Sequence, residues 1–415
     1  MMKILFLALI FVSFTYGEVL WHYHIDDSVY HHVKLMNYDH TVVSTEFNPP
    51  PSAQYFNDRS GTPLWFISAK DHGDFSHDAT GSLFGNKLAL AGFYKDISNS
   101  THVYANLEVY TIQGDSTTAP TPDWTWKLEG ATTFLGYHSV KMTMNDEEVF
   151  LFVTKMDSFS PQMVYHAQIY IFDAATGEIK FQYDAPSGTA TNDIEISLGG
   201  EIAMFNDEEQ FIVVDVRQNK IMWQEDFEEG DINPFSVSKD GRVIAHGTSQ
   251  LNVLTRVGNN YKLAYTVRNE SELLCATAVS ADSEVVVAVW LNKAYNQKRI
   301  EVYTSWSPIP IHTHTLPVHK GKFEDWVVDV KLTDDGQYAL IGSWGQSNST
   351  APTVILIERG AGIVYTYTTP GSVFDIDIID DPENGTVYFC SAGKEVHANE
   401  WGMGGDVYCF LHQKK

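Results

Sequence analysis

Short runs of alternating apolar and polar residues, each ended by a turn sequence, recur along this chain. In the segment 167–205 they predict four strands, at 168–172, 179–183, 193–197 and 201–205. The turns between them carry glycine at Gly177 and Gly200, where a positive φ costs least. No stretch of a dozen residues has an apolar face at helical spacing. The pattern therefore predicts an all-β chain.

The turn after the first strand of each unit is the clearest repeat. Its best copies are Ser197-Leu-Gly-Gly200, Ser238-Lys-Asp-Gly241, Ser280-Ala-Asp-Ser283 and Thr333-Asp-Asp-Gly336. Looser copies lie at 36–39, 82–85, 144–147 and 379–385. The turns are spaced by about 40–60 residues, a period typical of β-propellers with one four-stranded blade per repeat.

The strand pattern also predicts how the ring closes. Seven complete units end at Ser372, and an eighth begins at Val373 but stops after its third strand, at 407–410. The segment Val19–Ile25 has the pattern of a fourth strand, so we expect it to complete the last blade and leave no open sheet edge. The prediction is a single propeller of eight blades. Seven blades is the alternative, and two packed sandwiches would not need this period.

The N-terminus has the pattern of a secretory leader. Lys3 precedes the apolar run Ile4–Phe14, and small residues stand before a cleavage site expected after Gly17. We therefore assign 1–17 to a signal peptide and 18–415 to the propeller domain. No later apolar run is long enough for a membrane span. The sequons at Asn99, Asn269, Asn348 and Asn384 fit N-glycosylation of a protein that is secreted or held in the secretory or endolysosomal lumen.

Charge narrows the range of partners. The chain has 27 basic and 53 acidic residues and a formal net charge of −26. A broad basic surface for nucleic acid or for anionic lipid is therefore not expected. We expect a monomer with an acidic, soluble surface.

The chain has only three cysteines, so disulfides do not build its fold. Cys390 and Cys409 fall on predicted neighbouring strands of the last blade, where a cross-strand disulfide would form in an oxidising compartment. Cys275 is then expected to be a small buried apolar residue.

One repeat resembles a known family. Asp173-Ala-Ala-Thr-Gly177 followed by Phe181 resembles the blade motif of pyrroloquinoline-quinone-type eight-bladed propellers, and 215–223 is a second copy with Asn219 in place of glycine. In that family the aromatic residue docks on the next blade. The Ser-x-Asp-Gly and Thr-Asp-Asp-Gly turns resemble those of WD40-type and TolB-type propellers equally well. Enzymes of the quinoprotein family imply a quinone, Ca²⁺ and often a vicinal cysteine pair, and this sequence has no such pair.

Carboxylates on predicted innermost strands are the candidate ligand site, at the mouth of the propeller channel. They are Asp193, Glu195, Asp329, Asp375 and Asp377. Period-two spacing places Asp375 and Asp377 on one face of their strand, and Asp193 and Glu195 repeat that arrangement. Such pairs could hold Ca²⁺, which takes six to eight oxygen ligands. The alternative is that they cap backbone amides and hydroxyls of neighbouring blades.

Histidines and tryptophans give weaker signals. His22 with His24, and His312 with His314, form H-x-H pairs on fourth strands that could chelate zinc or copper, with His319 or Asp26 as a third ligand. A polar row that protects an edge strand is the favoured interpretation. Trp21, Trp65, Trp126 and Trp223 are expected to pack between blades. Trp290, Trp326, Trp344 and Trp401 lie nearer loops and could contribute to a ligand surface.

The sequence thus favours a secreted propeller that binds protein or glycan without catalysis and needs no cofactor. The alternative is an enzyme at the channel mouth, a quinone-dependent oxidoreductase or a hydrolase, that uses Ca²⁺ and the carboxylates named above. Nucleophile-elbow, zinc-protease and Walker A motifs are absent from the sequence.

Overall fold

A computed structural model describes most of the chain. The described residues are 18–26, 28–36, 40–46, 53–57, 60–67, 77–81, 86–95, 103–129, 139–143, 145–158, 164–184, 194–206, 210–226, 234–294, 296–318, 325–345, 351–397 and 404–414. Their regular elements are all strands, and they contain no helix long and apolar enough to cross a membrane.

The strands form eight antiparallel sheets of four strands each, which confirms the eight-bladed propeller. Blades 1 to 4 comprise β2 (Val29–Met36), β3 (His40–Glu46), β4 (Ala53–Asn57) and β5 (Thr62–Ile67); β6 (His77–Gly81), β7 (Lys87–Lys95), β8 (Val103–Thr111) and β9 (Pro122–Glu129); β10 (Ser139–Met142), β11 (Glu148–Ser158), β12 (Val164–Asp173) and β13 (Ile179–Asp184); and β14 (Ile194–Ile196), β15 (Ile202–Asn206), β16 (Gln210–Asp215) and β17 (Lys220–Asp226). Blades 5 to 8 comprise β18 (Phe235–Val237), β19 (Val243–His246), β20 (Gln250–Val257) and β21 (Asn260–Arg268); β22 (Glu272–Val279), β23 (Val285–Asn292), β24 (Gln297–Thr304) and β25 (His312–Pro317); β26 (Val327–Leu332), β27 (Tyr338–Ser343), β28 (Val354–Glu358) and β29 (Gly362–Tyr367); and β30 (Val373–Asp381), β31 (Thr386–Lys394), β32 (Gly405–Gln413) and β1 (Glu18–Ile25).

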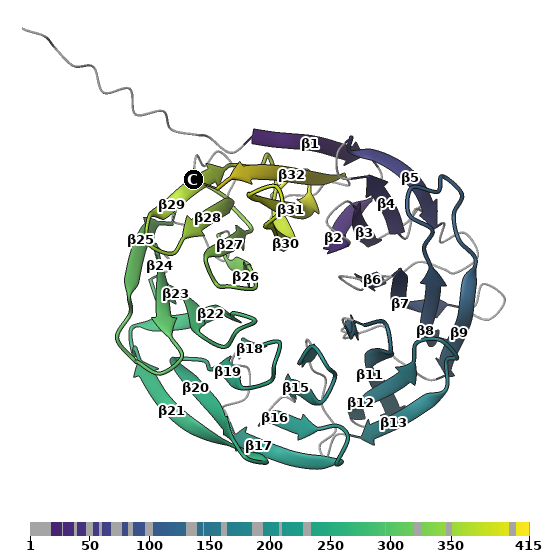
Figure 1. Ribbon diagram of the computed structural model, residues 1–415, viewed down its shortest axis with the longest axis horizontal. Helices are drawn as coiled ribbons and strands as arrows, with labels where there is room; N and C mark the ends of the chain where they lie inside the picture. Colours follow the sequence, from purple (N-terminus) through teal and green to yellow (C-terminus); the bar gives the residue numbers. More distant parts are fainter. Residues whose placement is uncertain are drawn as a thin grey trace, which may run out of the picture.

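The first strand of each blade lies nearest the ring axis and the fourth forms the outer rim (Figure 1). Because neighbouring strands of a blade are antiparallel, its first-to-second and third-to-fourth turns lie at the same end. We call the face of the ring that carries these turns the hairpin face. The second-to-third turns lie on the opposite face.

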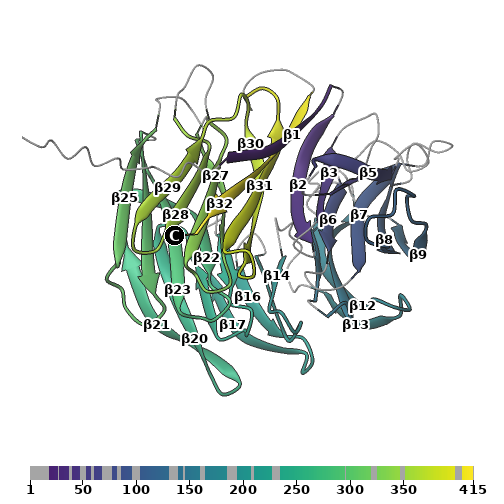
Figure 2. The same cartoon turned by 45° about the horizontal axis from the view of Figure 1, so that its top comes forward.

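The N-terminal strand closes the ring, as the sequence predicts. β1 pairs antiparallel with β32, from Glu18 opposite Leu411 to Ile25 opposite Gly405. Figure 2 shows these two strands, from opposite ends of the chain, side by side. The Trp21 indole donates a hydrogen bond of 3.0 Å to the Tyr388 hydroxyl, and its ring stacks on Phe56 of blade 1 at 5.2 Å. This strand therefore joins blade 8 to blade 1.

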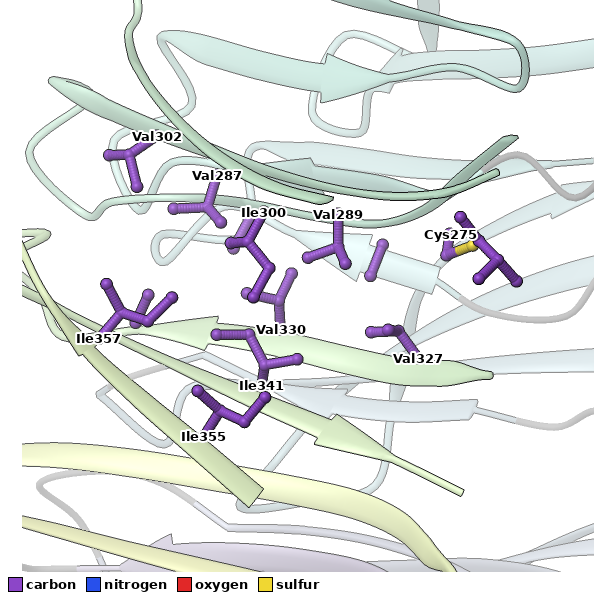
Figure 3. Packing of buried hydrophobic residues seen from close by; sticks show 14 of the residues in the cluster. Cys275, Val287, Val289, Ile300, Val302, Val327, Val330, Ile341, Ile355 and Ile357 are labelled. Atoms are coloured by element: carbon purple, nitrogen blue, oxygen red, sulfur yellow. The ribbon is translucent and has the colours of Figure 1, made fainter. Parts of the chain in front are cut away.

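The core is a series of apolar layers between adjacent blades. In one of them Val287 and Ile300 of blade 6 face Val330 and Ile341 of blade 7 (Figure 3). These positions alternate along their strands, since successive side chains of a strand point to opposite faces. Each blade therefore packs on both neighbours through branched aliphatic residues.

Aromatic residues of the outer strands cover glycines in the turns of the next blade. A Cβ at Gly61 would lie 2.6 Å from Trp21, and one at Gly177 would lie 2.7 Å from Trp124. The strand register corrects one sequence assignment: Trp124, rather than Trp126, follows the bulge that Trp65 and Trp223 follow in their strands. Both residues of the tryptophan pair nevertheless pack on the core between blades 2 and 3.

A second difference concerns the end of blade 8. The segment 391–405 is predicted to be a long glycine-rich loop, but β31 continues to Lys394 and pairs there with Gly405. Gly393 fits this strand because its Cα lies against backbone, where a Cβ would be 1.9 Å from the Ser372 oxygen.

Candidate functional site

The aspartates of β30 bind the backbone of the neighbouring blade. Asp375 accepts a hydrogen bond of 2.9 Å from the Val33 amide, and Asp377 accepts one of 2.9 Å from the Leu35 amide, both on β2. The first strand of a blade has no sheet partner on its axial side, so these amides need an acceptor from another blade. The alternative function named above for these carboxylates, backbone capping, is the one they perform here.

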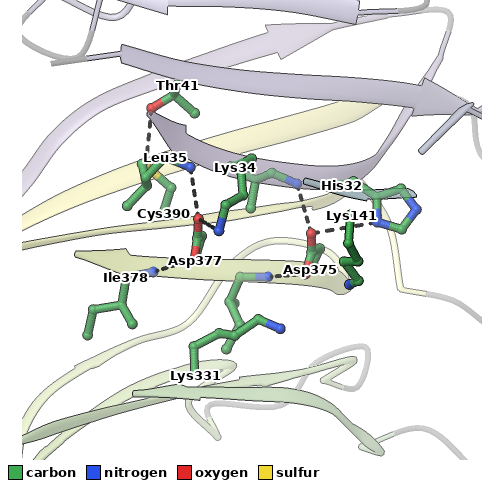
Figure 4. Close-up of polar contacts among 12 residues, drawn as sticks. His32, Lys34, Leu35, Thr41, Lys141, Lys331, Asp375, Asp377, Ile378 and Cys390 are labelled. Atoms are coloured by element: carbon green, nitrogen blue, oxygen red, sulfur yellow. Dashed lines mark hydrogen bonds and ion pairs between the residues drawn. The ribbon is translucent and has the colours of Figure 1, made fainter. Parts of the chain in front are cut away.

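Cations complete this cluster (Figure 4). Lys34 Nζ lies 2.9 Å from an Asp377 oxygen, and His32 Nδ1 lies 3.6 Å from Asp78 and 3.7 Å from Asp375. Burial alone would lower the pKa of His32, but the charges of Asp78 and Asp375 outweigh it and raise this pKa to about 9. His32 is therefore a cation at neutral pH.

The remaining axial carboxylates have lysine partners. Lys331 lies 2.8 Å from Asp329, and Lys141 lies 3.5 Å from Glu195. Burial, with the charge of Asp375 adding to it, raises the pKa of Asp329 to about 6 even though Lys331 opposes the rise. Burial would lower the pKa of Lys331, yet Asp329, Glu195 and Asp375 hold it well above its usual value. Asp193 lies outside the described residues.

The axial cluster is thus a set of paired charges that links blades 8, 1, 2 and 3, and blades 7 and 4. Within the described part of the chain, no three His, Cys, Asp or Glu side chains are grouped so that they could hold a metal ion. Ca²⁺ binding at Asp375 and Asp377 stays a prediction.

The histidine pairs of the outer strands differ from each other. His22 Nε2 and His24 Nδ1 lie 2.6 Å and 3.0 Å from the same oxygen of Asp406, a buried residue of β32. Sequence reasoning did not find Asp406, because it lies at the far end of the chain. On β25, burial lowers the pKa of His314, and His312 adds to that shift. His319 is outside the described residues.

The three cysteines occupy two environments. Cys390 and Cys409 are opposite each other on β31 and β32 and are joined as a disulfide. Cys275 is a free, buried thiol, and burial raises its pKa to about 12. It is therefore a core residue rather than a nucleophile.

Two of the four predicted glycosylation sites can be placed. Asn269 and Asn384 lie in turns, where Asn384 is exposed and Asn269 is half-buried. The Asn384 amide donates a hydrogen bond of 2.6 Å to Asp381, and the Asn269 amide donates one to Glu272. Asn99 and Asn348 lie outside the described residues.

The tryptophan prediction was wrong in one case. Trp290 is fully buried on β23, since both faces of a second strand are covered by neighbouring blades. Trp326 and Trp344 are half-buried, and Trp401 lies outside the described residues. The exposed tryptophan is Trp306, with 66% of its surface accessible.

Trp306 belongs to an apolar turn on the hairpin face of blade 6. The turn between β24 and β25 also exposes Ile309 by 72% and Ile311 by 44%. Its base is ordered by hydrogen bonds from the Ser305 amide to Glu284 and from the Ile311 amide to Val302. Exposed apolar side chains that gather in one place mark interaction sites more often than single ones do. The signal in the sequence was the run Trp-Ser-Pro-Ile-Pro-Ile, in which two prolines prevent strand pairing.

Two buried ionic networks also escaped sequence reasoning. Lys298 Nζ lies 2.5 Å from Asp325 and 2.8 Å from Ser343 Oγ, between blades 6 and 7. Arg299 contacts Glu272 and Glu301, and Tyr303 donates to Glu301. The only sequence signal is the repeat of Glu-Val-Tyr-Thr at 108–111 and 301–304. Both networks are internal and act in packing.

Comparisons with known proteins support the fold. No family model matches the chain, and no curated protein is significantly similar to it in sequence. Among solved structures, the propeller of Dos1 is similar over 96% of both chains, with a TM-score of 0.60 and 12% identity. A chain of a mitotic checkpoint complex aligns over 64% of this chain and 72% of its own, with a TM-score of 0.45 and 13% identity. At such identities the likeness to Dos1 establishes the propeller and nothing finer.

Proposed function

We propose that this protein is a secreted or luminal scaffold that binds another protein without catalysing a reaction. The observation that carries the proposal is the exposed apolar turn of Trp306, Ile309 and Ile311 on a rigid blade. Such a turn loses little conformational entropy on binding, because its base is already fixed to β23 and β24. Tryptophan is also among the residues that contribute most to protein interfaces.

The axial charges support the non-catalytic half of the proposal. Asp375 and Asp377 each serve a backbone amide of blade 1 and a cation. A carboxylate held in this way is not free to act as a general base or nucleophile. The leader pattern at 1–17 and the placement of Asn384 in an exposed turn support the secretory route.

Site-specific photo-crosslinking tests the binding surface. A benzophenone amino acid placed at Trp306 in the full-length protein, expressed in its own secretory pathway, should give one dominant protein adduct. The same group at Phe66, which is 59% exposed on β5, is the matched control and should not give this adduct. Equal adducts from both positions, or from neither, would contradict the proposed surface.

Elemental analysis and an absorption spectrum of the purified protein test the absence of catalysis. We expect no quinone-like band and less than one metal ion per chain. Stoichiometric Ca²⁺ together with such a band would contradict the scaffold and favour the oxidoreductase.

A further inference from the structure

The hairpin face changes sign at blade 5. The turns of most blades carry an acidic excess there: blade 3 has Asp146, Glu147, Glu148, Asp173 and Glu178 against Lys180, and blade 6 has Asp282 and Glu284. Blade 5 instead has Lys239, Arg242, Arg256 and Lys262 against Asp240. On a chain with a formal net charge of −26, this is a local reversal of the surface potential.

Part of this positive charge is compensated within the protein. Lys239 Nζ lies 2.5 Å from Asp334, and Arg256 lies 3.9 Å from Glu201. Arg242 keeps 76% of its side-chain surface exposed beside Asp240, and Lys262 is exposed. Arg242 and Lys262 are therefore the cations best placed to meet a partner.

Aliphatic side chains lie among these cations. Val257 at the end of β20 is 51% exposed, and Leu263 on β21 is 50% exposed, next to Lys262. Lys220 of blade 4 reaches the same hairpin, since its Nζ lies 3.2 Å from Asn260 Oδ1. The blade 5 hairpin thus presents apolar and basic groups together.

Blade 5 continues directly into the apolar turn of blade 6. The Tyr265 hydroxyl on β21 donates a hydrogen bond of 2.9 Å to the Thr304 oxygen, immediately before Trp306. The turns of the two blades also touch, as Ser283 Oγ donates to Asp240 at 2.6 Å. β21 and β25 follow each other along the outer rim (Figure 1). Val257, Leu263, Trp306, Ile309, Ile311, Arg242 and Lys262 form what we call the docking surface.

We propose that the docking surface binds an acidic protein segment in which aliphatic side chains alternate with carboxylates. This inference rests on the proposed function and specifies its partner. Carboxylates of the segment would meet Arg242 and Lys262, and its aliphatic groups would cover Leu263 and Trp306. Elsewhere the acidic surface repels such a segment, so the local reversal of charge selects one place for it and raises its rate of association.

A synthetic peptide tests this chemistry on the full-length protein. The probe is a fluorescein-labelled 12-residue peptide of alternating Glu and Leu, and a Lys-Leu peptide of equal length is its control. We expect the Glu-Leu peptide alone to bind, with an affinity that falls as salt rises from 0.05 to 0.5 M. Arg242→Glu with Lys262→Glu should raise its Kd at least tenfold.

The control variant is Arg268→Glu with Lys293→Glu. It makes the same change of charge at exposed residues of blades 5 and 6, but on the opposite face. Its Kd for the Glu-Leu peptide should stay within twofold of wild type. Equal weakening by both double variants, or tighter binding of the Lys-Leu peptide, would overturn the inference. So would binding of a sulfated heparin oligosaccharide at this surface while the Glu-Leu peptide does not bind.

Photo-crosslinking separates this inference from the proposed function. If the Arg242→Glu, Lys262→Glu variant still gives the full yield of the adduct at Trp306, the scaffold stands and the acidic partner is wrong. If the adduct falls at least tenfold in that variant and persists in the control variant, the acidic partner is supported.

Discussion

Asp377 illustrates how one axial side chain stabilises two blades. Its Oδ2 accepts from the Leu35 amide and from Lys34 at 2.9 Å each, and its Oδ1 accepts from the Ile378 amide at 3.1 Å. Removing the carboxylate leaves a buried amide without its acceptor. We expect Asp377→Ala to lower the free energy of unfolding by about 2 kcal/mol, as for other buried donors that lose their acceptor. Denaturant titration measures this.

Asp26→Ala is the control for that substitution, because the Asp26 side chain is 93% exposed. Its free energy of unfolding should stay within about 0.5 kcal/mol of wild type. Equal stability of Asp377→Ala and wild type would show that the axial contacts contribute nothing, and would leave the carboxylate available for a ligand.

His32 predicts a dependence of stability on pH. Its pKa rises from 6.5 to about 9 in the fold, so folding favours the protonated form. The stabilisation is complete below pH 6.5 and is lost as the pH rises through 9. The free energy of unfolding should therefore fall across this window, less steeply in His32→Gln. Because the side chain is 35% exposed, solvent screening reduces the size of the effect but not its sign.

His314→Gln is the control for the pH experiment. Burial lowers the pKa of His314, so this residue is neutral across the window and its loss should leave the slope unchanged. A wild-type free energy that is flat or rises between pH 6.5 and 9 would contradict the charged state assigned to His32.

At the scale of elements, the turns between first and second strands depend on glycine. Gly336 has φ +60°, and a Cβ there would lie 2.7 Å from Val285 of the neighbouring blade. Gly258 has a similar φ of +63°, with nothing within 4 Å of its Cβ position. Gly336→Ala should cost about 3 kcal/mol, from backbone strain and overpacking together. Gly258→Ala should cost about 1 kcal/mol, from strain alone.

Denaturant titration of the two glycine variants separates these terms. A difference of less than about 0.5 kcal/mol between them would mean that the blades adjust to the added methyl group. The hairpin of Gly258 would then be no more tolerant than the turns that face the axis.

Local patterns predicted the elements well, because strands and turns depend on neighbours in sequence. The turn at Ser238–Gly241 and the placement of Asp375 and Asp377 on an innermost strand follow from alternation and turn chemistry. Contacts between blades could not be predicted in this way. Leu35 and Asp377 are 342 residues apart, and Trp290 and Trp306 differ in burial because of what the adjacent blades cover. No local rule contains that information.

At the scale of the whole molecule, ring closure depends on the first strand after the leader. The Cys390–Cys409 disulfide ties β31 to β32, whereas β1 joins β32 by the hydrogen bonds of its ladder. Trp21 strengthens this seam because it is buried between blades 8 and 1. Opening of the ring should therefore begin with β1, while β32 stays with its blade.

Trp21→Ala tests this order of opening. Loss of a buried tryptophan costs about 3 kcal/mol, and here the cost falls on one seam. Hydrogen exchange should then quicken first in β1 and at the amides of β32 that pair with it, with the other blades still protected. Trp126→Ala, in the layer between blades 2 and 3, is the control and should leave β1 protected. Uniform loss of protection in Trp21→Ala would mean that the ring unfolds as one cooperative unit, with no weak point where its ends meet.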